Sequence, residues 1–170
     1  NVSCPNVVGL TALQDITFLS DIVDRLLDLR MYYDEYRPIL LKVSPDLSHE
    51  QLDEIIDYCL RSGIDGIVAG NTTRSRDGLT SISKEKIEEI GNGGMSGAPV
   101  HKKNLELVRY VHTKSEGKLP IIGVGGIMSP EQAKDMLDAG ASLVEIYSGF
   151  IYEGPSLVKR IQKYLEQTVK

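Results

Sequence analysis

The sequence predicts an α/β fold in which helices cover a parallel sheet. Short apolar runs alternate with amphipathic helical segments along the chain, and the runs are almost continuously apolar. Continuous apolar runs are typical of parallel strands that are covered on both faces, and short strand–helix connections give right-handed βαβ units. A chain of 170 residues with 41% hydrophobic residues can bury the core of one such domain.

The apolar runs predict four strands and, at the first residues of the chain, the stub of a fifth. Each run has the length of an ordinary buried strand. In chain order they are Asn1–Ser3 (the stub), Ile39–Val43, Gly66–Gly70, Pro120–Val124 and Ser142–Tyr147.

Apolar residues at helical spacing predict the helices between these strands. Ser48 and Gln51 can form a capping box at the start of one helix, and Gly63 can end it. Ser129 and Gly140 repeat the start and stop signals. The predicted helices run roughly over residues 16–29, 48–62, 104–113, 129–139 and 155–165.

This alternation fits either an open doubly wound sheet or part of a (β/α)8 TIM barrel. A complete barrel takes about 250 residues, and this chain starts without Met at the end of a strand-like run. We therefore expect the C-terminal half of a barrel, about strands 4–8 with their helices. Residues 1–170 are expected to form the C-terminal part of a single domain.

Composition argues against several classes of protein. The formal net charge of −5 and the pI of about 5.2 disfavour an extended nucleic-acid surface, and no apolar run reaches the roughly 18 residues of a membrane span. Two cysteines, Cys4 and Cys59, are too few for a disulfide framework. No zinc site is expected. We place Cys59 in the core and His49, His101 and His112 on the solvent side of their helices.

The first six residues carry the densest set of reactive groups. Asn1, Ser3 and Asn6 supply amides and a hydroxyl around Cys4, and such groups can bind a polar planar ring and remove a proton from it. Cys4, fixed beside Pro5, is either a small buried apolar residue or a proton acceptor whose pKa a cation or helix terminus lowers.

Lys42 places a charge inside an apolar strand. A buried lysine is costly unless it is paired. It therefore either pairs with a carboxylate such as Glu145 or faces a ligand that requires positive charge.

Glycine and polar residues follow the other strands, at 70–73, 123–126 and 147–149, and a further glycine-rich loop spans 91–97. Functional residues of a barrel gather at these strand ends, and the last two strands commonly hold a phosphate. Glycine lets the backbone approach an anion closely. Two clusters at adjacent strand ends, together with Lys42, favour a phosphate-bearing cofactor.

Six ordered blocks, which together cover essentially the whole chain, resemble the dihydroorotate dehydrogenase family, flavin mononucleotide (FMN) enzymes of pyrimidine (UMP) biosynthesis built on a (β/α)8 barrel. The later blocks are most similar to the quinone-linked, membrane-associated class 2. The blocks are 1–10, 41–47, 70–73, 93–97, 121–126 and 141–149.

The resemblance implies a role for each candidate residue. Cys4 falls at the position of the catalytic base, which would take a proton from C5 of dihydroorotate while a hydride passes from C6 to the flavin. The substrate-binding positions are Asn1, Asn6, Asn71 and Thr72. The cofactor-binding positions are Asn1, Lys42, Gly70, Ser96, Gly97, Gly125, Gly126, Tyr147 and Ser148, with Lys42 beside the flavin ring.

The resemblance also implies a setting. Dihydroorotate and orotate are the expected substrate and product, and a quinone is the expected acceptor. Because Cys4 is typical of class 1 and Ser of class 2, fumarate and nicotinamide stay open as acceptors. The expected location is cytoplasmic, with peripheral attachment to the inner (cell) membrane through a preceding N-terminal region.

Two alternatives stay open. Another phosphate-binding barrel, such as a sugar-phosphate isomerase, would use the same glycine clusters without a flavin or Lys42. The chain alone could also be an inactive half-barrel that binds its missing half or a copy of itself, because five βα units cannot close a barrel and leave open sheet edges.

Overall fold

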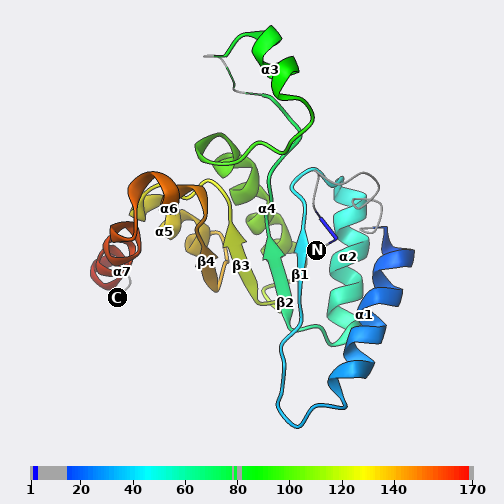
Figure 1. Ribbon diagram of the computed structural model, residues 1–170. Coiled ribbons are helices and arrows are strands. Elements are labelled where there is room, and N and C mark those ends of the chain that lie inside the picture. Colours follow the sequence, from blue (N-terminus) through cyan, green and yellow to red (C-terminus); the bar gives the residue numbers. More distant parts are fainter. Residues whose placement is uncertain (1, 4–14, 78, 80–81, 169–170) are drawn as a thin grey trace.

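A computed structural model describes residues 2–3, 15–77, 79 and 82–168 of the chain. Four strands form one sheet: β1 (Leu40–Val43), β2 (Gly66–Ala69), β3 (Ile121–Val124) and β4 (Leu143–Glu145). All neighbours are parallel, and their order in the sheet is β1-β2-β3-β4 (Figure 1). A doubly wound sheet reverses its strand order at a switch point. The described strands never do, so their order is that of a barrel.

The helices follow the strands in the predicted alternation. They are α1 (Ile16–Arg30), α2 (His49–Ser62), α3 (Lys84–Ile90), α4 (His101–Lys114), α5 (Pro130–Asp138), α6 (Ser148–Glu153) and α7 (Ser156–Thr168), with a short 3-10 turn η2 (Ala98–Val100) before α4. The capping box of Ser48 and Gln51 is present, and Gly63 ends α2 in the left-handed conformation. Ser129 accepts a hydrogen bond from the backbone of Gln132 at the start of α5.

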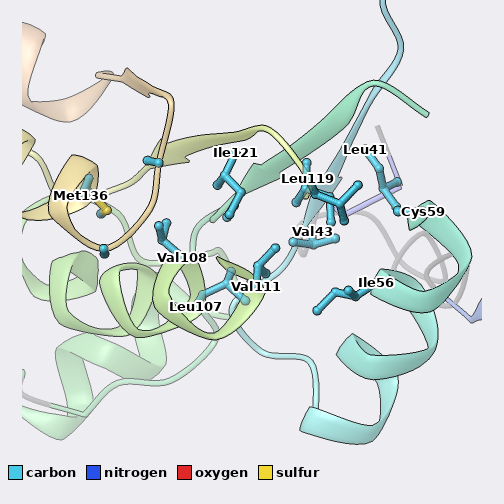
Figure 2. Packing of buried hydrophobic residues seen from close by; sticks show 14 of the residues in the cluster. Leu41, Val43, Ile56, Cys59, Leu107, Val108, Val111, Leu119, Ile121 and Met136 are labelled. Atoms are coloured by element: carbon cyan, nitrogen blue, oxygen red, sulfur yellow. The ribbon is translucent and has the colours of Figure 1, made fainter. Parts of the chain in front are cut away.

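The core lies between the sheet and the helices packed against it. Leu41 and Val43 of β1 face Ile56 and Cys59 of α2 (Figure 2). Ile121 of β3 packs with buried residues of α4. Side chains of the opposite parity, such as those of Lys42 and Ile122, are only half-buried. One face of the sheet is therefore covered by helices, and the other is the face that a closed barrel turns inward.

Three predictions need correction. Val2 and Ser3, the described part of the predicted stub, form no strand. The oxygens of Ser3 accept hydrogen bonds from the Asn71 side chain, just after β2. Helix α3 was not predicted, since it has no buried residue and hence no apolar stripe. Helix α4 begins at His101, three residues earlier than predicted. Val100 precedes it without a capping side chain, so no start signal marks this position in the sequence.

Candidate functional site

A cavity of about 240 Å³ lies where the four strands end. Its walls come from β1, from the segments that follow β2 and β3, from β4 with the start of α6, and from the turn before α4. The lining residues are Lys42, Asn71, Thr72, Ser96, Gly97, Val100, Val124, Gly125, Gly126, Ile127, Glu145, Tyr147, Ser148 and Gly149.

Lys42 and Glu145 face each other in this cavity. Lys42 Nζ lies 3.6 Å from Glu145 Oε1, and the two side chains are 34% and 47% exposed. The lysine is therefore paired, as one of the two interpretations expects. Because both residues line the cavity, the pair also presents a cation to whatever the cavity holds.

Asn71 connects the end of β2 to the beginning of the chain. Its Nδ2 donates to both the carbonyl and the hydroxyl oxygen of Ser3, at 2.9 Å each, and its Oδ1 accepts from the backbone nitrogen of Thr72 at 2.8 Å. Ser3 is fully buried. The residue just before Cys4 in the sequence is thus fixed against a residue of the cavity wall.

Asp46 is hydrogen-bonded to the segment that follows β2. Its carboxylate accepts from the Thr73 hydroxyl (2.5 Å), the Arg74 backbone nitrogen (2.8 Å) and Lys103 Nζ (2.5 Å). Burial would raise the pKa of Asp46, but the hydrogen bonds from Lys103, Thr73 and Arg74 outweigh it and hold the pKa below its usual value. The ionised carboxylate of Asp46 therefore accepts the hydrogen bonds that fix this segment.

The glycine-rich loop reaches the cavity through a short antiparallel bridge. Thr73 and Met95 exchange backbone hydrogen bonds of 3.1 and 2.8 Å. Ser96 and Gly97 follow directly and line the cavity, where the Ser148 hydroxyl donates to the Ser96 hydroxyl oxygen at 3.3 Å. Loop 91–97 and the start of α6 therefore meet across the site.

His101 was expected to face solvent, and that expectation is wrong. Both of its ring nitrogens are buried, without a hydrogen-bond partner among the described residues. Burial lowers the pKa of His101, and the charge of Asp135 and the backbone of Gly125 offset this only in part. Because α4 starts earlier than predicted, His101 is part of the helix and lies against the segment that follows β3. His49 and His112 are exposed, as expected, and Cys59 is in the core.

The structure brings most of the candidate residues together. Lys42, Asn71, Thr72, Ser96, Gly97, Gly125, Gly126, Tyr147 and Ser148 all line the cavity. Gly70 precedes Asn71 at the end of β2 without lining it, and Asn1, Cys4 and Asn6 lie outside the described residues.

Sequence reasoning missed the apolar wall of Val100, Val124 and Ile127. Val124 and Ile127 flank the Gly125-Gly126 pair, and this adjacency is the signal that could have found them. The cavity thus combines an apolar wall, one ion pair, hydroxyls and glycine backbone, a donor set suited to a flat ring system that carries a phosphate.

Within the described ranges, no group of three or more His, Cys, Asp or Glu side chains could hold a metal ion. No helix in the same ranges has the length and apolar character needed to cross a membrane.

Comparison with known proteins adds independent findings. The family model described as dihydroorotate dehydrogenase matches residues 1–169. Proteins named dihydroorotate dehydrogenase (quinone) from Christiangramia forsetii, Salinispora arenicola and Proteus mirabilis are 47%, 43% and 41% identical. The matches cover 98%, 94% and 97% of this chain and 48%, 44% and 49% of those proteins. The chain spans about half the length of the curated relatives it matches.

Solved structures agree with the sequence relatives. Ligand-free dihydroorotate dehydrogenase from Eimeria tenella superposes with a TM-score of 0.89 at 30% identity, over 99% of this chain and 51% of that one. The same enzyme in complex with ferulenol gives a TM-score of 0.88 at 29% identity, over 97% of this chain and 47% of that one. The predicted fold class, part of a (β/α)8 barrel, is confirmed.

Proposed function

Because the chain belongs to the dihydroorotate dehydrogenase family, we propose that it forms about half of an FMN-dependent enzyme that oxidises dihydroorotate to orotate in pyrimidine biosynthesis. A quinone is the proposed electron acceptor. One observation carries the proposal. Residues from all four strand ends, which the resemblance assigns separately to substrate and flavin, line a single cavity.

The residues present fit FMN. Gly125, Gly126 and Gly97 offer backbone groups, and Ser96 and Ser148 offer hydroxyls, that would hold the phosphate. The apolar wall would hold the flat ring. When bound, the flavin supplies the hydride acceptor that no amino-acid side chain provides.

Lys42 has an electrostatic role in this proposal. Its ammonium group is held by Glu145 at 3.6 Å and stays partly exposed to the cavity. A fixed cation costs no reorganisation when negative charge develops next to it. Lys42 would therefore stabilise the negative charge of the reduced flavin ring.

The substrate side is proposed to be formed by Asn71 and Thr72 together with Asn1 and Asn6. The Asn71 amide is oriented by Ser3 and Thr72, which leaves one lone pair of its Oδ1 for a ring N–H. Amides match the alternating donors and acceptors of a pyrimidine ring.

Cys4 is the proposed base. Oxidation of dihydroorotate removes one proton and one hydride, and we assign the proton to the Cys4 thiolate. Support comes from its place in the sequence beside Ser3, which hydrogen-bonds to Asn71 of the cavity wall. The thiol of Cys59 is unsuited to the role of base, because burial raises its pKa to about 12.

We further propose attachment to the surface of the cell membrane from the cytoplasmic side, since quinones are dissolved in the bilayer. The experiment that tests the function is purification of the complete protein, followed by flavin analysis and an assay for orotate with dihydroorotate and a quinone. A colourless protein would favour a sugar-phosphate isomerase or another flavin-free barrel. Flavin-loaded protein that forms no orotate would also contradict the proposal.

A second candidate applies to the 170-residue chain taken alone, which we propose to be an inactive half-barrel. Within the described residues, β1 and β4 each pair on one side only. Leu143 of β4 is 62% exposed, and open edges of this kind favour pairing with another strand. The chain alone would bind its missing half or a second copy of itself.

A further inference from the structure

Asn104, in the first turn of α4, is a fully buried polar residue outside the cavity lining. Its Nδ2 donates to the backbone carbonyl of Asn71 at 3.1 Å. Its Oδ1 is buried and has no hydrogen-bond partner within the described part of the chain. Buried polar atoms normally have a hydrogen-bond partner, and leaving one without a partner costs stability. An apolar side chain would fill this buried position without that cost, so packing alone does not explain the amide.

Two glycines make room for this amide. Gly70 (φ +134°) directly follows β2, and Gly125 (φ +112°) directly follows β3. A methyl group at Gly70 would overlap Asn104 Oδ1, and one at Gly125 would overlap Asn104 Nδ2. The Asn104 side chain is therefore wedged between the ends of two neighbouring strands, with backbone on both sides of it.

The two strand ends belong to different halves of the site. Gly70 leads into Asn71 and Thr72, which the proposed function assigns to the substrate. Gly125 leads into Gly126, which it assigns to the flavin. Asn104 hydrogen-bonds to the segment that begins with Asn71 and packs against Gly125. Although it does not line the cavity, it therefore sets the distance between these two segments.

We propose that Asn104 is a positioning residue that fixes the Asn71–Thr72 segment relative to the Gly125–Gly126 segment. It acts through Asn71 and touches neither substrate nor cofactor. The inference rests on the proposed function and extends it to a residue that neither the strand-end pattern nor the cavity lining includes.

The test compares Asn104→Leu with Val111→Ala in the complete, flavin-loaded protein. Leucine keeps the heavy-atom skeleton of asparagine but cannot donate to Asn71. Val111 is fully buried on the same helix, near its other end, so its truncation weakens packing without touching the strand ends. Three quantities are measured for each variant: the dissociation constant of orotate by calorimetry, the flavin content, and the Tm.

We expect Asn104→Leu to weaken orotate binding about tenfold, the value of one well-placed hydrogen bond, with unchanged flavin content. We expect Val111→Ala to lower the Tm and to bind orotate as the wild type does. If leucine overpacks the site, Asn104→Ala removes the same donor and should give the same loss of orotate affinity.

Orotate binding by Asn104→Leu or Asn104→Ala at wild-type strength would overturn the inference. So would an equal loss of orotate affinity in Val111→Ala, because it would show that weakened packing of α4 alone produces the effect. The wild type separates this failure from failure of the function. If the wild-type protein binds flavin but no orotate, the proposed function itself is wrong.

Discussion

Lys42 on β1 and Glu145 on β4 form an ion pair at 3.6 Å although β2 and β3 lie between their strands. In a flat sheet, three strand spacings would separate the two backbones by about 14 Å. Side chains stand roughly perpendicular to a sheet, so the pair forms because the sheet curls and its concave face brings the two side chains together. The curvature of a barrel, and the cavity it encloses, are already present in these four strands.

The first prediction concerns this ion pair. We expect Lys42→Met to slow flavin reduction by dihydroorotate about a hundredfold, because removal of one fixed charge that stabilises developing negative charge costs about 10²–10³ in rate. Stopped-flow absorbance of the flavin measures the effect. Lys114→Met is the matched control, since Lys114 is also ion-paired, to Asp53, on the outer surface. Equal rates in the two variants would remove Lys42 from the mechanism.

The second prediction separates the two thiols. We expect Cys4→Ala to slow flavin reduction by orders of magnitude and Cys59→Ala to leave its rate nearly unchanged while lowering stability by about 1 kcal/mol. With Cys4 as base, the wild-type rate should rise with pH as that thiol ionises. Because burial raises the pKa of Cys59 to about 12, Cys59 cannot cause such a rise at neutral pH.

A wild-type rate in Cys4→Ala would contradict the assignment of the base. Cys4→Ser is a useful third variant, because serine occupies the base position in class 2 enzymes of this family. Partial activity in Cys4→Ser, with its rise shifted to higher pH, is the expected result.

The third prediction concerns acid stability. The pKa of Asp46 is lowered in the folded protein, so its contribution to stability is present above its ordinary pKa of about 4 and is lost as the pH falls through the lower folded value. Asp46→Asn should therefore destabilise the protein at neutral pH by about 1–2 kcal/mol, the value of charge-assisted hydrogen bonds. The stability of this variant should also fall less steeply below about pH 4 than that of the wild type.

Thermal unfolding between pH 3 and pH 7 measures both effects. Asp21→Asn is the control, because Asp21 forms an exposed i,i+4 ion pair with Arg25 on α1. An identical pH profile for wild type and Asp46→Asn would show that the carboxylate does not hold the segment after β2.

The fourth prediction concerns the chain alone. We expect the 170-residue chain to be a dimer or larger in size-exclusion chromatography, since β1 and β4 leave open edges in the described sheet. Leu143→Lys, on the edge strand β4, should shift it toward monomer. Leu60→Lys, at a partly exposed position of α2, is the control. A monomeric wild-type chain would contradict the half-barrel account.

Much of the fold could be predicted because its signals are local. Each of the four strands lies within its predicted range, and their predicted ends place Lys42, Asn71 and Gly126 together. This works because parallel strands gather their carboxyl ends at one edge. Position along a strand is then enough to bring residues that are distant in sequence into one cavity.

The missed features depend on packing rather than on pattern. His101 and Asn104 are polar, so apolar periodicity leaves them out, yet the first turn of α4 buries both beneath glycine-bearing strand ends. Helix α3 carries five charged residues among its seven and buries no residue. Only the arrangement in space shows that the polar residues of α4 belong to the site and those of α3 do not.

The most direct test of the central claim is anaerobic addition of dihydroorotate to the complete protein while the absorbance of its bound flavin is recorded. If the strand-end cavity holds flavin and substrate together, the oxidised flavin band should disappear, with one orotate formed for each flavin. A bound flavin that stays oxidised in excess dihydroorotate would contradict this account.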